Sequence, residues 1–382
     1  MAINIIENKV EVNYSSYTKL FNGVAGIGKT AMFFEIPKKL YGRGTAILFS
    51  LGDEPRPKHL AGAKYVSIDT FEDLIDAVND LCKNRLTKFK NIREIGFDTV
   101  DELFRLAEKH VVEEYNDSVS VSERVKTISG AYKGFQRGEN RVVDLVISTC
   151  FKLSKYGYGV TFLGHSKYKN KKDQVTGIEV ELLTSSLDNK YYNAIKDHVN
   201  FVGMAYYDVE FANVKVVKDV FSKGTKEVAD EIKSKKRVIC FRDDDFAMDT
   251  KSHFGLINEK CDFSADAIIE TIYDAIKEEV KNELEIDEIT DETLLEMQQE
   301  QFEDMMVEVS EMIEVEQREE NIKNAQNERE DMLSFIMNNS KNIKSESMTK
   351  IRQILKNSGK AGLSELTDKD LKEVYVLAQD LN

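Results

Sequence analysis

Cysteine is scarce in this sequence, and long apolar runs are absent from it. The 382 residues include four cysteines, and none of them forms a C-x-x-C pair or a Cys/His spacing typical of zinc: Cys82, Cys150, Cys240 and Cys261. We therefore expect buried, reduced thiols in a cytoplasmic protein. No run of about 18 apolar residues occurs, and the start, MAINIIENKVEV, lacks a basic segment followed by a long apolar one. This pattern predicts neither a membrane span nor a signal peptide.

Proline and glycine are missing from much of the second half of the chain. No proline follows Pro57, and no glycine lies between Gly255 and Gly359. Apolar residues recur there at helical spacing among many glutamates. This composition and spacing predict an acidic helical or partly disordered arm over residues 263–331.

The last residues, 332–382, predict a small helical module. Their pattern is a helix, a glycine-containing turn and a second helix. Thr367 is the expected N-cap of that second helix, because Asp370 follows three residues later.

Negative charge is confined to one part of the chain. The formal net charge is −15, but residues 270–331 alone contain 23 acidic and 5 basic residues. The remainder therefore carries about +3. An overall negative charge argues against nucleic-acid binding. Because the charge is concentrated in one segment, the rest of the chain is still compatible with nucleic-acid binding. The acidic arm itself is either a solvated helical spacer, a competitor for a basic surface, or a docking segment for a basic partner.

Residues 1–262 predict an α/β domain. Short apolar runs rich in β-branched residues alternate with helix-period segments, which indicates a layered, mostly parallel sheet with helices on its faces. The expected strands are residues 45–51, 64–68, 92–97, 159–164, 199–206, 214–220 and 236–241. The last of them follow one another closely, which favours an antiparallel extension at one edge.

A phosphate-binding pattern opens this domain. The stretch GVAGIGKT is a complete G-x-x-x-x-G-K-[ST] loop between an expected strand and a helix that Pro37 limits or kinks. Glycines let backbone N–H groups close around phosphates, and a helix N-terminus adds partial positive charge. Lys29 is expected to reach the β- and γ-phosphates of ATP. The predicted nucleotide-binding residues are Gly23, Val24, Ala25, Gly26, Ile27, Gly28, Lys29, Thr30 and Ala31.

Mg²⁺ and a catalytic carboxylate complete such a site. The hydroxyl of Thr30 and the carboxylate of Asp98, at the end of an apolar strand, are the predicted Mg²⁺ ligands. Hydrolysis also needs a carboxylate to orient or deprotonate the attacking water. Two places supply one: Asp101 and Glu102 after Asp98, or Asp53 and Glu54 in the turn ILFSLGDEPRP.

At this point the chain resembles a known family. The loop followed by a strand with an acidic pair is similar to the RecA-like core. Residues 14–262 resemble phage-encoded RecA-like ATPases, including single-strand annealing and recombination-mediator proteins. The motifs that carry the resemblance occur in the order GVAGIGKT, LGDEPRP, IGFDTVDEL, GVTFLGHSKYK, YNAIKDHVNFV and FAMDTKSHFG. The resemblance implies a RecA-like P-loop core, with Glu54 as the catalytic glutamate and Asp53 as the second choice.

The resemblance also implies a sensor and a DNA-binding element. His165 ends the strand GVTFLGH, where RecA-like proteins carry a polar γ-phosphate sensor that leads into a DNA-binding loop. The expected basic loop contains Lys167, Tyr168, Lys169, Lys171 and Lys172. Lysines contact phosphates and an aromatic ring stacks on bases, so this composition favours single-stranded DNA.

A third motif implies a role between subunits. FAMDTKSHFG resembles the stretch that hexameric helicases insert into a neighbouring nucleotide site. Lys251 matches the lysine of that stretch, a cation that would act on the neighbouring subunit's nucleotide, whereas His253 stands where an arginine is expected and cannot make a bidentate contact. The implied protein is a homo-oligomer, ring or filament, with ATP at the subunit interface.

We therefore predict a cytoplasmic, oligomeric ATPase of phage type that couples ATP to single-stranded DNA in recombination or replication, inside the host cell if a phage encodes it. The alternatives are a DNA helicase or helicase loader, and a nucleotide-dependent switch that binds only proteins. A small-molecule kinase is a further alternative, but no cluster of lid arginines accompanies the phosphate loop.

Overall fold

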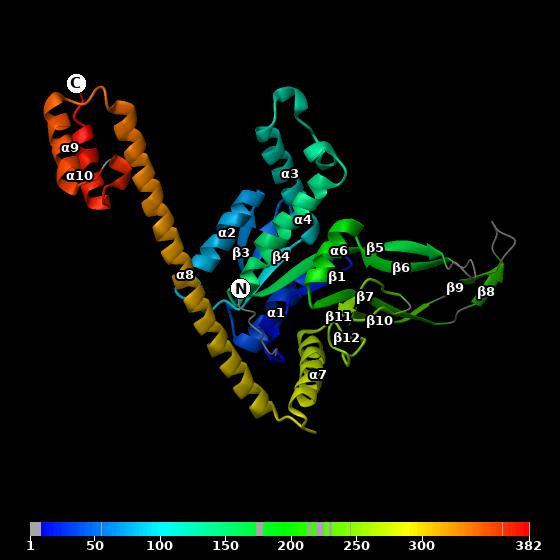
Figure 1. Cartoon of the computed structure of the whole chain (residues 1–382). Helices are drawn as coiled ribbons and strands as arrows, with labels where there is room; N and C mark the ends of the chain where they lie inside the picture. Colours follow the sequence, from blue (N-terminus) through cyan, green and yellow to red (C-terminus); the bar gives the residue numbers. More distant parts are fainter. Residues whose placement is uncertain are drawn as a thin grey trace. The chain divides into compact units, whose positions relative to one another are not determined.

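The computed structural model describes residues 9–54, 56–172, 179–212, 215–218, 225–228, 231–244, 246–360 and 362–381. Within helices and strands, the side chains of residues 171–172, 180, 211–212, 215–218, 225–228 and 231 are outside the description. Figure 1 shows the chain, which divides into two compact units, Met1–Val309 and Ser310–Asn382.

The helices and strands follow one another along the chain as the sequence predicts for an α/β domain. The helices are α1 Lys29–Tyr41, α2 Phe71–Lys83, α3 Val100–Ser118, α4 Arg137–Cys150, α5 Lys152–Lys155, α6 Asn189–His198, α7 Ala265–Leu284, α8 Asp291–Asn339, α9 Ser345–Ser358 and α10 Asp368–Ala378. The strands are β1 Lys19–Gly23, β2 Ala46–Leu51, β3 Lys64–Ile68, β4 Glu94–Asp98, β5 Gly159–Lys172, β6 Glu179–Ser185, β7 Phe201–Ala212, β8 Lys215–Lys218, β9 Thr225–Val228, β10 Glu231–Cys240, β11 Lys251–Ser252 and β12 Lys260–Asp262.

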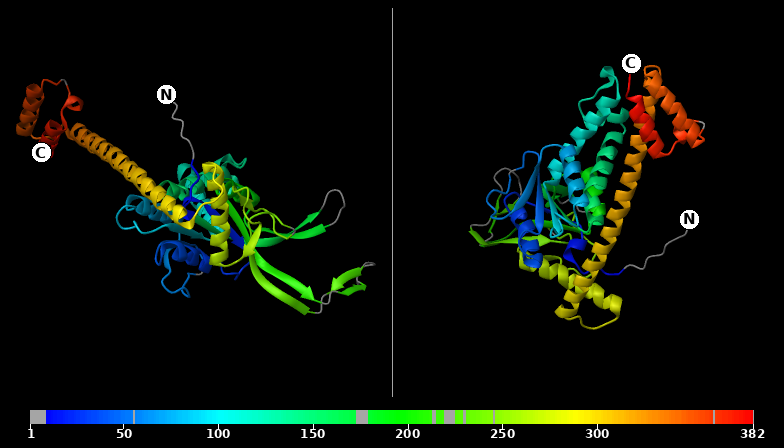
Figure 2. Two further views of the ribbon diagram at one scale, coloured as in Figure 1. Left: turned by 90° about the horizontal axis from the view of Figure 1, so that it is seen from below. Right: turned by 90° about the vertical axis from the view of Figure 1, so that its left-hand side faces the viewer.

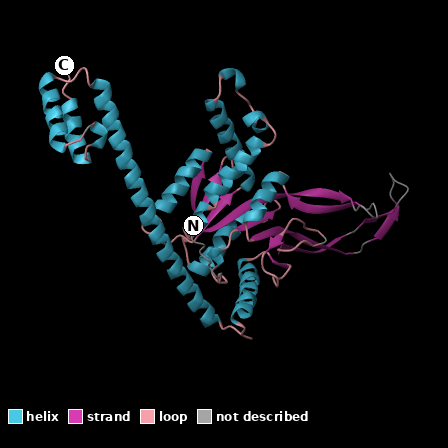
Figure 3. Ribbon diagram, in the orientation of Figure 1, coloured by secondary structure: helices cyan, strands magenta, loops and turns pink. Residues whose placement is uncertain are grey.

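One large sheet organises the first unit. In the described residues it has ten strands, with the path β12-β10-β7-β1-β5-β4-β2-β3; β6 pairs with β5, and β11 pairs with β7. The strands from β7 to β3 along this path are parallel, and β10, β12, β11 and β6 pair antiparallel. Figure 3 shows this sheet with helices around it. The predicted α/β class, with a layered, mostly parallel sheet and an antiparallel extension, is confirmed.

Helices cover both faces of the sheet. Phe33 of α1 lies against Gly96 of β4, where a Cβ would come within 2.6 Å of its ring. α1 and α7 also contact each other, and they share a core with Phe21 of β1. Val100, at the start of α3, lies against Gly164 of β5. Gly164 is paired in register with Asn22 of β1, and Asn22 is the neighbour of Phe21 along that strand. Because neighbouring strand residues point to opposite faces, α1 and α3 cover opposite sides of the sheet.

A buried ion pair joins two strands that are not neighbours. Lys19 of β1 donates to Glu94 Oε1 of β4 at 2.8 Å, and both side chains are essentially inaccessible. Thr161 of β5, the strand between them, donates to Glu94 Oε2 at 3.1 Å. Gly159 leaves room for this carboxylate, since a Cβ there would lie 2.0 Å from it. The pair therefore fixes the order β1-β5-β4 at the centre of the sheet.

Two sets of strands run beyond the sheet, as Figure 2 shows. β5 continues through residues 166–172 and pairs with β6 as an antiparallel hairpin. β7 and β10 likewise pair over a long stretch. The prediction of a loop directly after His165 is thus wrong. Residues 166–172 instead extend β5, because pairing with β6 satisfies their backbone hydrogen-bonding groups.

The second unit has its own core. Six buried residues form much of it, drawn from the end of α8, from the segment after it and from α9 and α10: Met332, Ile336, Ile343, Ile351, Leu371 and Val374. Thr367 caps α10 and accepts a hydrogen bond from the Asp370 backbone N–H at 3.3 Å, as predicted. Gly359 ends α9 in the left-handed conformation.

The acidic region consists mainly of the helices α7 and α8, which the non-helical residues 285–290 connect. α7 belongs to the first unit, because Ile268, Ile272 and Ile276 are buried in the core beneath α1. The first part of α8, up to Val309, belongs there too, and Gln298 and Gln301 exchange hydrogen bonds with the segment before β1. The predicted division into 1–262, 263–331 and 332–382 thus differs from the two compact units, and as a functional division it stays a prediction. In the described residues, no helix is both long and apolar enough to span a bilayer.

Candidate nucleotide site

The phosphate loop joins β1 to α1 at the carboxyl edge of the sheet. Gly26 and Gly28 have φ of +75° and +108°, a region where residues with a Cβ are strained. Gly28 precedes the first turn of α1, so backbone N–H groups at that helix start have no helical partner. The sequence therefore forms an anion-binding loop where the motif predicts it.

Lys29 points back into the loop. Its Nζ donates to the Gly23 carbonyl at 2.9 Å and to the Val24 carbonyl at 3.5 Å. Burial lowers the pKa of Lys29, although nearby carboxylates, Asp98 foremost, oppose this. A buried ammonium held only by carbonyls can exchange them for phosphate oxygens when a nucleotide enters.

Thr30 and Asp98 meet at the same edge. The Thr30 hydroxyl donates to Asp98 Oδ2 at 2.8 Å, and Asp98 is 9% exposed. Burial raises the pKa of Asp98, while the hydrogen bond from Thr30 and the charge of Lys29 counteract it. A hydroxyl and a carboxylate oxygen are ligands that Mg²⁺ accepts when phosphate and water supply the rest, so these two residues fit the ion. In the described residues, no cluster of three or more His, Cys, Asp or Glu offers a complete metal site.

The two candidate carboxylates of the β2 turn point in different directions. Glu54 Oε1 accepts a hydrogen bond from the Thr99 hydroxyl at 3.2 Å, next to Asp98. Burial raises the pKa of Glu54; the charge of His165 lowers it, and that of Asp98 raises it further. Asp53 instead is 99% exposed and lies 3.6 Å from Arg105. The structure therefore brings Glu54 into the site and leaves Asp53 outside.

His165 belongs to a small polar network. It lies in register with Gly23, so β5 delivers it beside the phosphate loop. The His165 backbone N–H donates to Asp101 Oδ2 at 3.3 Å, and its ring Nδ1 lies 3.6 Å from the same oxygen. The Ser186 hydroxyl donates to Asp101 Oδ1 at 2.6 Å. The hydrogen bond to Asp101 raises the pKa of His165, although burial opposes it.

Asp101 is the acceptor at the centre of this network. Burial disfavours its ionised form, but the hydrogen bonds from His165 and Ser186 outweigh burial, so its pKa lies below the ordinary value. Glu102 is paired with Arg105 instead. The other pair of carboxylates that the sequence offered for hydrolysis thus has partners of its own.

The predicted DNA-binding residues lie on the β5–β6 hairpin. Lys167, Tyr168 and Lys169 are exposed, and only the backbones of Lys171 and Lys172 are described. Tyr168 makes an edge contact with Phe246, with ring centroids 6.0 Å apart. Alternation along a strand puts Lys167 and Lys169 on the opposite face. Tyr168 therefore does not share one surface with Lys167 and Lys169, as a loop would have allowed.

Lys251 and His253 lie away from the phosphate loop of their own chain. Lys251 is opposite Val202, near the start of β7, whereas Gly23 is opposite Ala205. Its Nζ donates to the Lys196 carbonyl at 2.7 Å, at the end of α6. Burial lowers the pKa of His253, and the charge of Lys251 adds to this. A role for Lys251 in a neighbouring subunit's site stays a prediction.

Three residues near the site were missed from the sequence. Thr99 binds Glu54, Ser186 binds Asp101, and Arg237 Nη1 donates to the Ile27 carbonyl of the phosphate loop at 3.2 Å. Thr99 had a local signal, since it precedes α3 as a helix cap. Ser186 and Arg237 had none, because only the sheet topology brings them to the loop.

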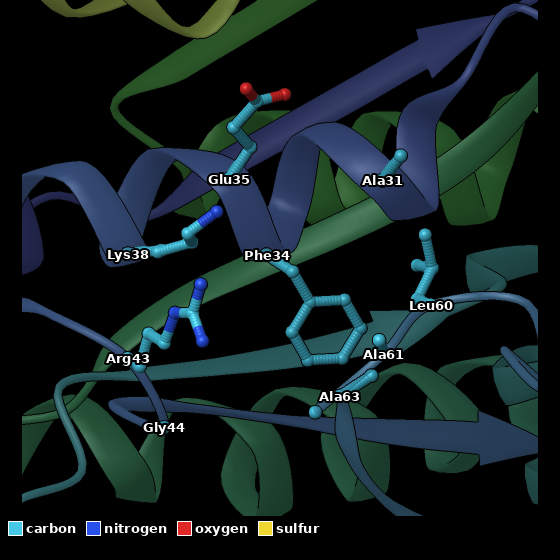
Figure 4. A pocket seen from close by; sticks show the side chains of 10 residues that line it. Ala31, Phe34, Glu35, Lys38, Arg43, Gly44, Leu60, Ala61 and Ala63 are labelled. Atoms are coloured by element: carbon cyan, nitrogen blue, oxygen red, sulfur yellow. The ribbon is translucent and has the colours of Figure 1, made fainter.

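A cleft of about 590 Å³ lies beside α1, away from the carboxylates of the site. Figure 4 shows Phe34 of α1 pointing toward Ala61 and Ala63, which precede β3. Glu35, Lys38 and Arg43 add charge to its lining. Ala31 is the one predicted nucleotide-binding residue among those that line this cleft.

Comparison with known proteins identifies the family. A family model described as an AAA domain matches residues 15–248, which is more than half of the chain. The chain belongs to this AAA domain family. The phosphate loop and Asp98 both lie within the matched part, so the AAA domain carries a nucleotide-binding P-loop site.

Two solved structures also resemble the AAA domain. One is a KaiC-like protein from the hyperthermophilic archaeon Pyrococcus horikoshii OT3, 12% identical, with a TM-score of 0.30; the match covers 59% of this chain and 85% of that one. The other is the RadB recombinase, 10% identical, with a TM-score of 0.29, covering 59% and 87%. No curated protein matches the chain. At such identities and scores neither likeness bears on function.

Proposed function

We propose that the protein hydrolyses ATP and uses its nucleotide state to change its grip on single-stranded DNA, in recombination or replication of phage type. The proposal rests above all on one observation: Asp101, three residues after Asp98, accepts hydrogen bonds at the root of the β5–β6 hairpin, from His165 of β5 and from Ser186, the residue after β6. A carboxylate beside the nucleotide site thus holds the base of the basic element.

The residues of the candidate site would each have a separate chemical role. Lys29 would leave the Gly23 carbonyl and neutralise the β- and γ-phosphates. Glu54, held by Thr99, would orient the attacking water and accept its proton, which suits a carboxyl whose pKa is raised. Mg²⁺, held by Thr30 and Asp98, would supply charge that stabilises the leaving phosphate oxygens.

His165 would transmit the presence of a bound nucleotide to the β5–β6 hairpin. A phosphate near His165 would compete with Asp101 for its ring, and Asp101 also holds Ser186, the residue after β6. The two strands would then shift together, because they are paired from Ser166 to Lys172. Lys167 and Lys169 on the outer face would contact phosphates of a single strand, a salt-sensitive interaction.

Oligomerisation belongs to the same proposal. Lys251 would act as a cation on the nucleotide of a neighbouring copy, because it does not reach the phosphate loop of its own chain. The homo-oligomer would then be a ring or filament with ATP between subunits, and the acidic region could dock a basic partner.

ATPase rates with and without single-stranded DNA test the proposal. We expect stimulation at low salt that fades as salt rises, because exposed lysines are screened. Replacing Lys167, Lys169, Lys171 and Lys172 together by Ala is expected to abolish stimulation while nucleotide affinity stays unchanged. The matched control removes four exposed lysines elsewhere on the AAA domain: Lys58, Lys64, Lys83 and Lys90.

If both quadruple variants lose DNA stimulation to the same extent, the loss is an effect of net charge, and the hairpin is not the DNA-binding element. A wild-type rate that DNA leaves unchanged at every salt concentration, with no DNA binding, would favour the protein-binding switch instead.

A further inference from the structure

The phosphate loop has two unlike sides. On one side of β1 lie β5, β4 and β2, which bring His165, Asp98 and the turn with Glu54 to the site. On the other side lie β7 and then β10. Arg237 projects from β10, so it reaches the loop from the side opposite the carboxylates.

The backbone of Arg237 is firmly placed. It is opposite Tyr207 in the β7–β10 ladder, and its carbonyl accepts a hydrogen bond from the Phe263 N–H at 2.9 Å. Phe263 is buried, and it directly precedes Ser264, the N-cap of α7. The side chain therefore starts from a strand that is held on both sides.

The guanidinium of Arg237 lies against the loop itself. Its Nη1 donates to the Ile27 carbonyl at 3.2 Å and would lie 3.3 Å from a Cβ on Gly28. Gly28 directly precedes Lys29, so the charge sits beside the backbone that is expected to surround the phosphates.

Among the described residues, most of the binding capacity of this guanidinium is unused. A guanidinium has about five N–H donors, and the one bond that the described residues show, to Ile27, engages one of them. Within the described part of the chain, no carboxylate forms an ion pair with Arg237, and the residue is exposed. Arg105 and Arg141, also on this domain, each pair with a glutamate. An arginine at a phosphate loop without an acidic partner is electrostatically suited to an anion.

We propose that Arg237 binds the phosphate chain of the nucleotide from the β10 side, as a nucleotide-binding residue supplied by the same chain. This inference rests on the proposed function, since it deepens the description of the same site. The Ile27 carbonyl would hold one edge of the guanidinium, leaving its other donors for phosphate oxygens. Lys29 and Arg237 would then approach the nucleotide from different sides, which distinguishes Arg237 from the cation expected from a neighbouring copy.

The test compares Arg237→Ala with a matched variant of the same strand. Lys235 lies two residues earlier on the same face, where its Nζ stacks over Tyr207 at 4.1 Å from the ring centroid. Lys235→Ala removes the same charge farther from the loop. The affinity of the full chain for a fluorescent ATP analogue with Mg²⁺ is measured by titration at two salt concentrations.

We expect Arg237→Ala to weaken affinity by roughly 10-fold or more, as for loss of a charge-assisted hydrogen bond, and to make it less sensitive to salt. Lys235→Ala is expected to stay within about twofold of wild type, because exposed charges at a distance are screened. Arg237→Lys is expected to recover part of the loss, because it restores the charge without the second donor edge.

Other outcomes overturn the inference. Equal affinities for Arg237→Ala and Lys235→Ala would exclude a direct contact. A weakened Arg237→Ala that keeps the wild-type salt sensitivity, is not rescued by lysine and melts at lower temperature without nucleotide would show that Arg237 only supports the loop. If the wild-type chain itself binds no nucleotide, the proposed function fails as well, which separates the two failures.

Discussion

The centre of the sheet and the β5–β6 hairpin handle charge in opposite ways. At the centre, Lys19, Lys29 and Asp98 are buried, and each has a named partner. On the hairpin, Lys167 and Lys169 are exposed. Buried charges lose hydration and depend on one specific contact each, whereas exposed charges act through their sum and are screened by salt. Single substitutions should therefore have large effects at the centre and small ones on the hairpin.

The largest effect is expected at Glu54. Glu54→Gln keeps the shape of the side chain but removes the proton acceptor, so the rate of ATP hydrolysis should fall by about 10²–10⁴-fold. Asp53→Asn, the neighbouring carboxylate, should leave the rate near wild type because Asp53 is exposed and points to Arg105. Single-turnover hydrolysis, with nucleotide affinity measured in parallel, separates chemistry from binding.

The pH dependence of that reaction provides a second check on Glu54. Its raised pKa means that the carboxylate becomes protonated, and inactive as a base, at a higher pH than an ordinary glutamate. Activity should therefore decline on acidification before the ordinary value of about 4.3 is reached. A large loss in Asp53→Asn with a small one in Glu54→Gln would reverse the assignment.

The next effect concerns stability. Lys19→Met leaves Glu94 buried without its cation, so the free energy of unfolding should fall by about 3–5 kcal/mol. Burial already raises the pKa of Glu94, and Lys19 opposes that rise. Urea unfolding of the full chain, monitored through a probe in the AAA domain, measures the loss.

The double variant Lys19→Met with Glu94→Gln is the control. It removes both charges, so it should recover part of the stability that the single variant loses. If Lys19→Met has the same free energy of unfolding as wild type, Lys19 does not stabilise the fold by compensating the buried charge of Glu94.

Much of this arrangement could be predicted from sequence because local patterns determine it. The phosphate loop, the strand before Asp98 and the turn with Glu54 each follow from residues adjacent in the chain. β3 begins and ends at the predicted residues, 64 and 68. The Thr367 cap likewise depends on residues three positions apart.

The rest depends on contacts between distant segments. Glu94 made the strand before Asp98 look only partly apolar, yet it is buried because Lys19 and Thr161 come from two other strands. Ser186 and Arg237 reach the site through pairing of β6 and β10, which no short motif encodes. The lysine-rich run after His165 reads as a loop by composition, but pairing with β6 makes it a strand and puts Tyr168 on the opposite face from Lys167 and Lys169.

A smaller effect is expected at His165. Its hydrogen bond to Asp101 raises its pKa, so any stability it contributes is fully present below the unfolded value of about 6.5 and is lost as pH rises through the folded value. NMR titration should show that Asp101→Asn lowers the pKa of His165. His253, whose pKa burial lowers, should not respond. If the pKa of His165 stays unchanged in Asp101→Asn, Asp101 does not interact with the His165 ring, and the proposed link from the nucleotide site to the hairpin is wrong.

The smallest effect is expected at Lys169. Lys169→Ala should change the free energy of unfolding by less than about 0.5 kcal/mol, because the side chain is exposed on the hairpin. It should weaken single-stranded DNA binding modestly and reduce the slope of log affinity against log salt by about 0.7, one phosphate contact. Urea unfolding and DNA titrations at several salt concentrations measure both. A loss of stability near that of Lys19→Met would mean that the hairpin lysines are structural, and the contrast with the centre of the sheet would then fail.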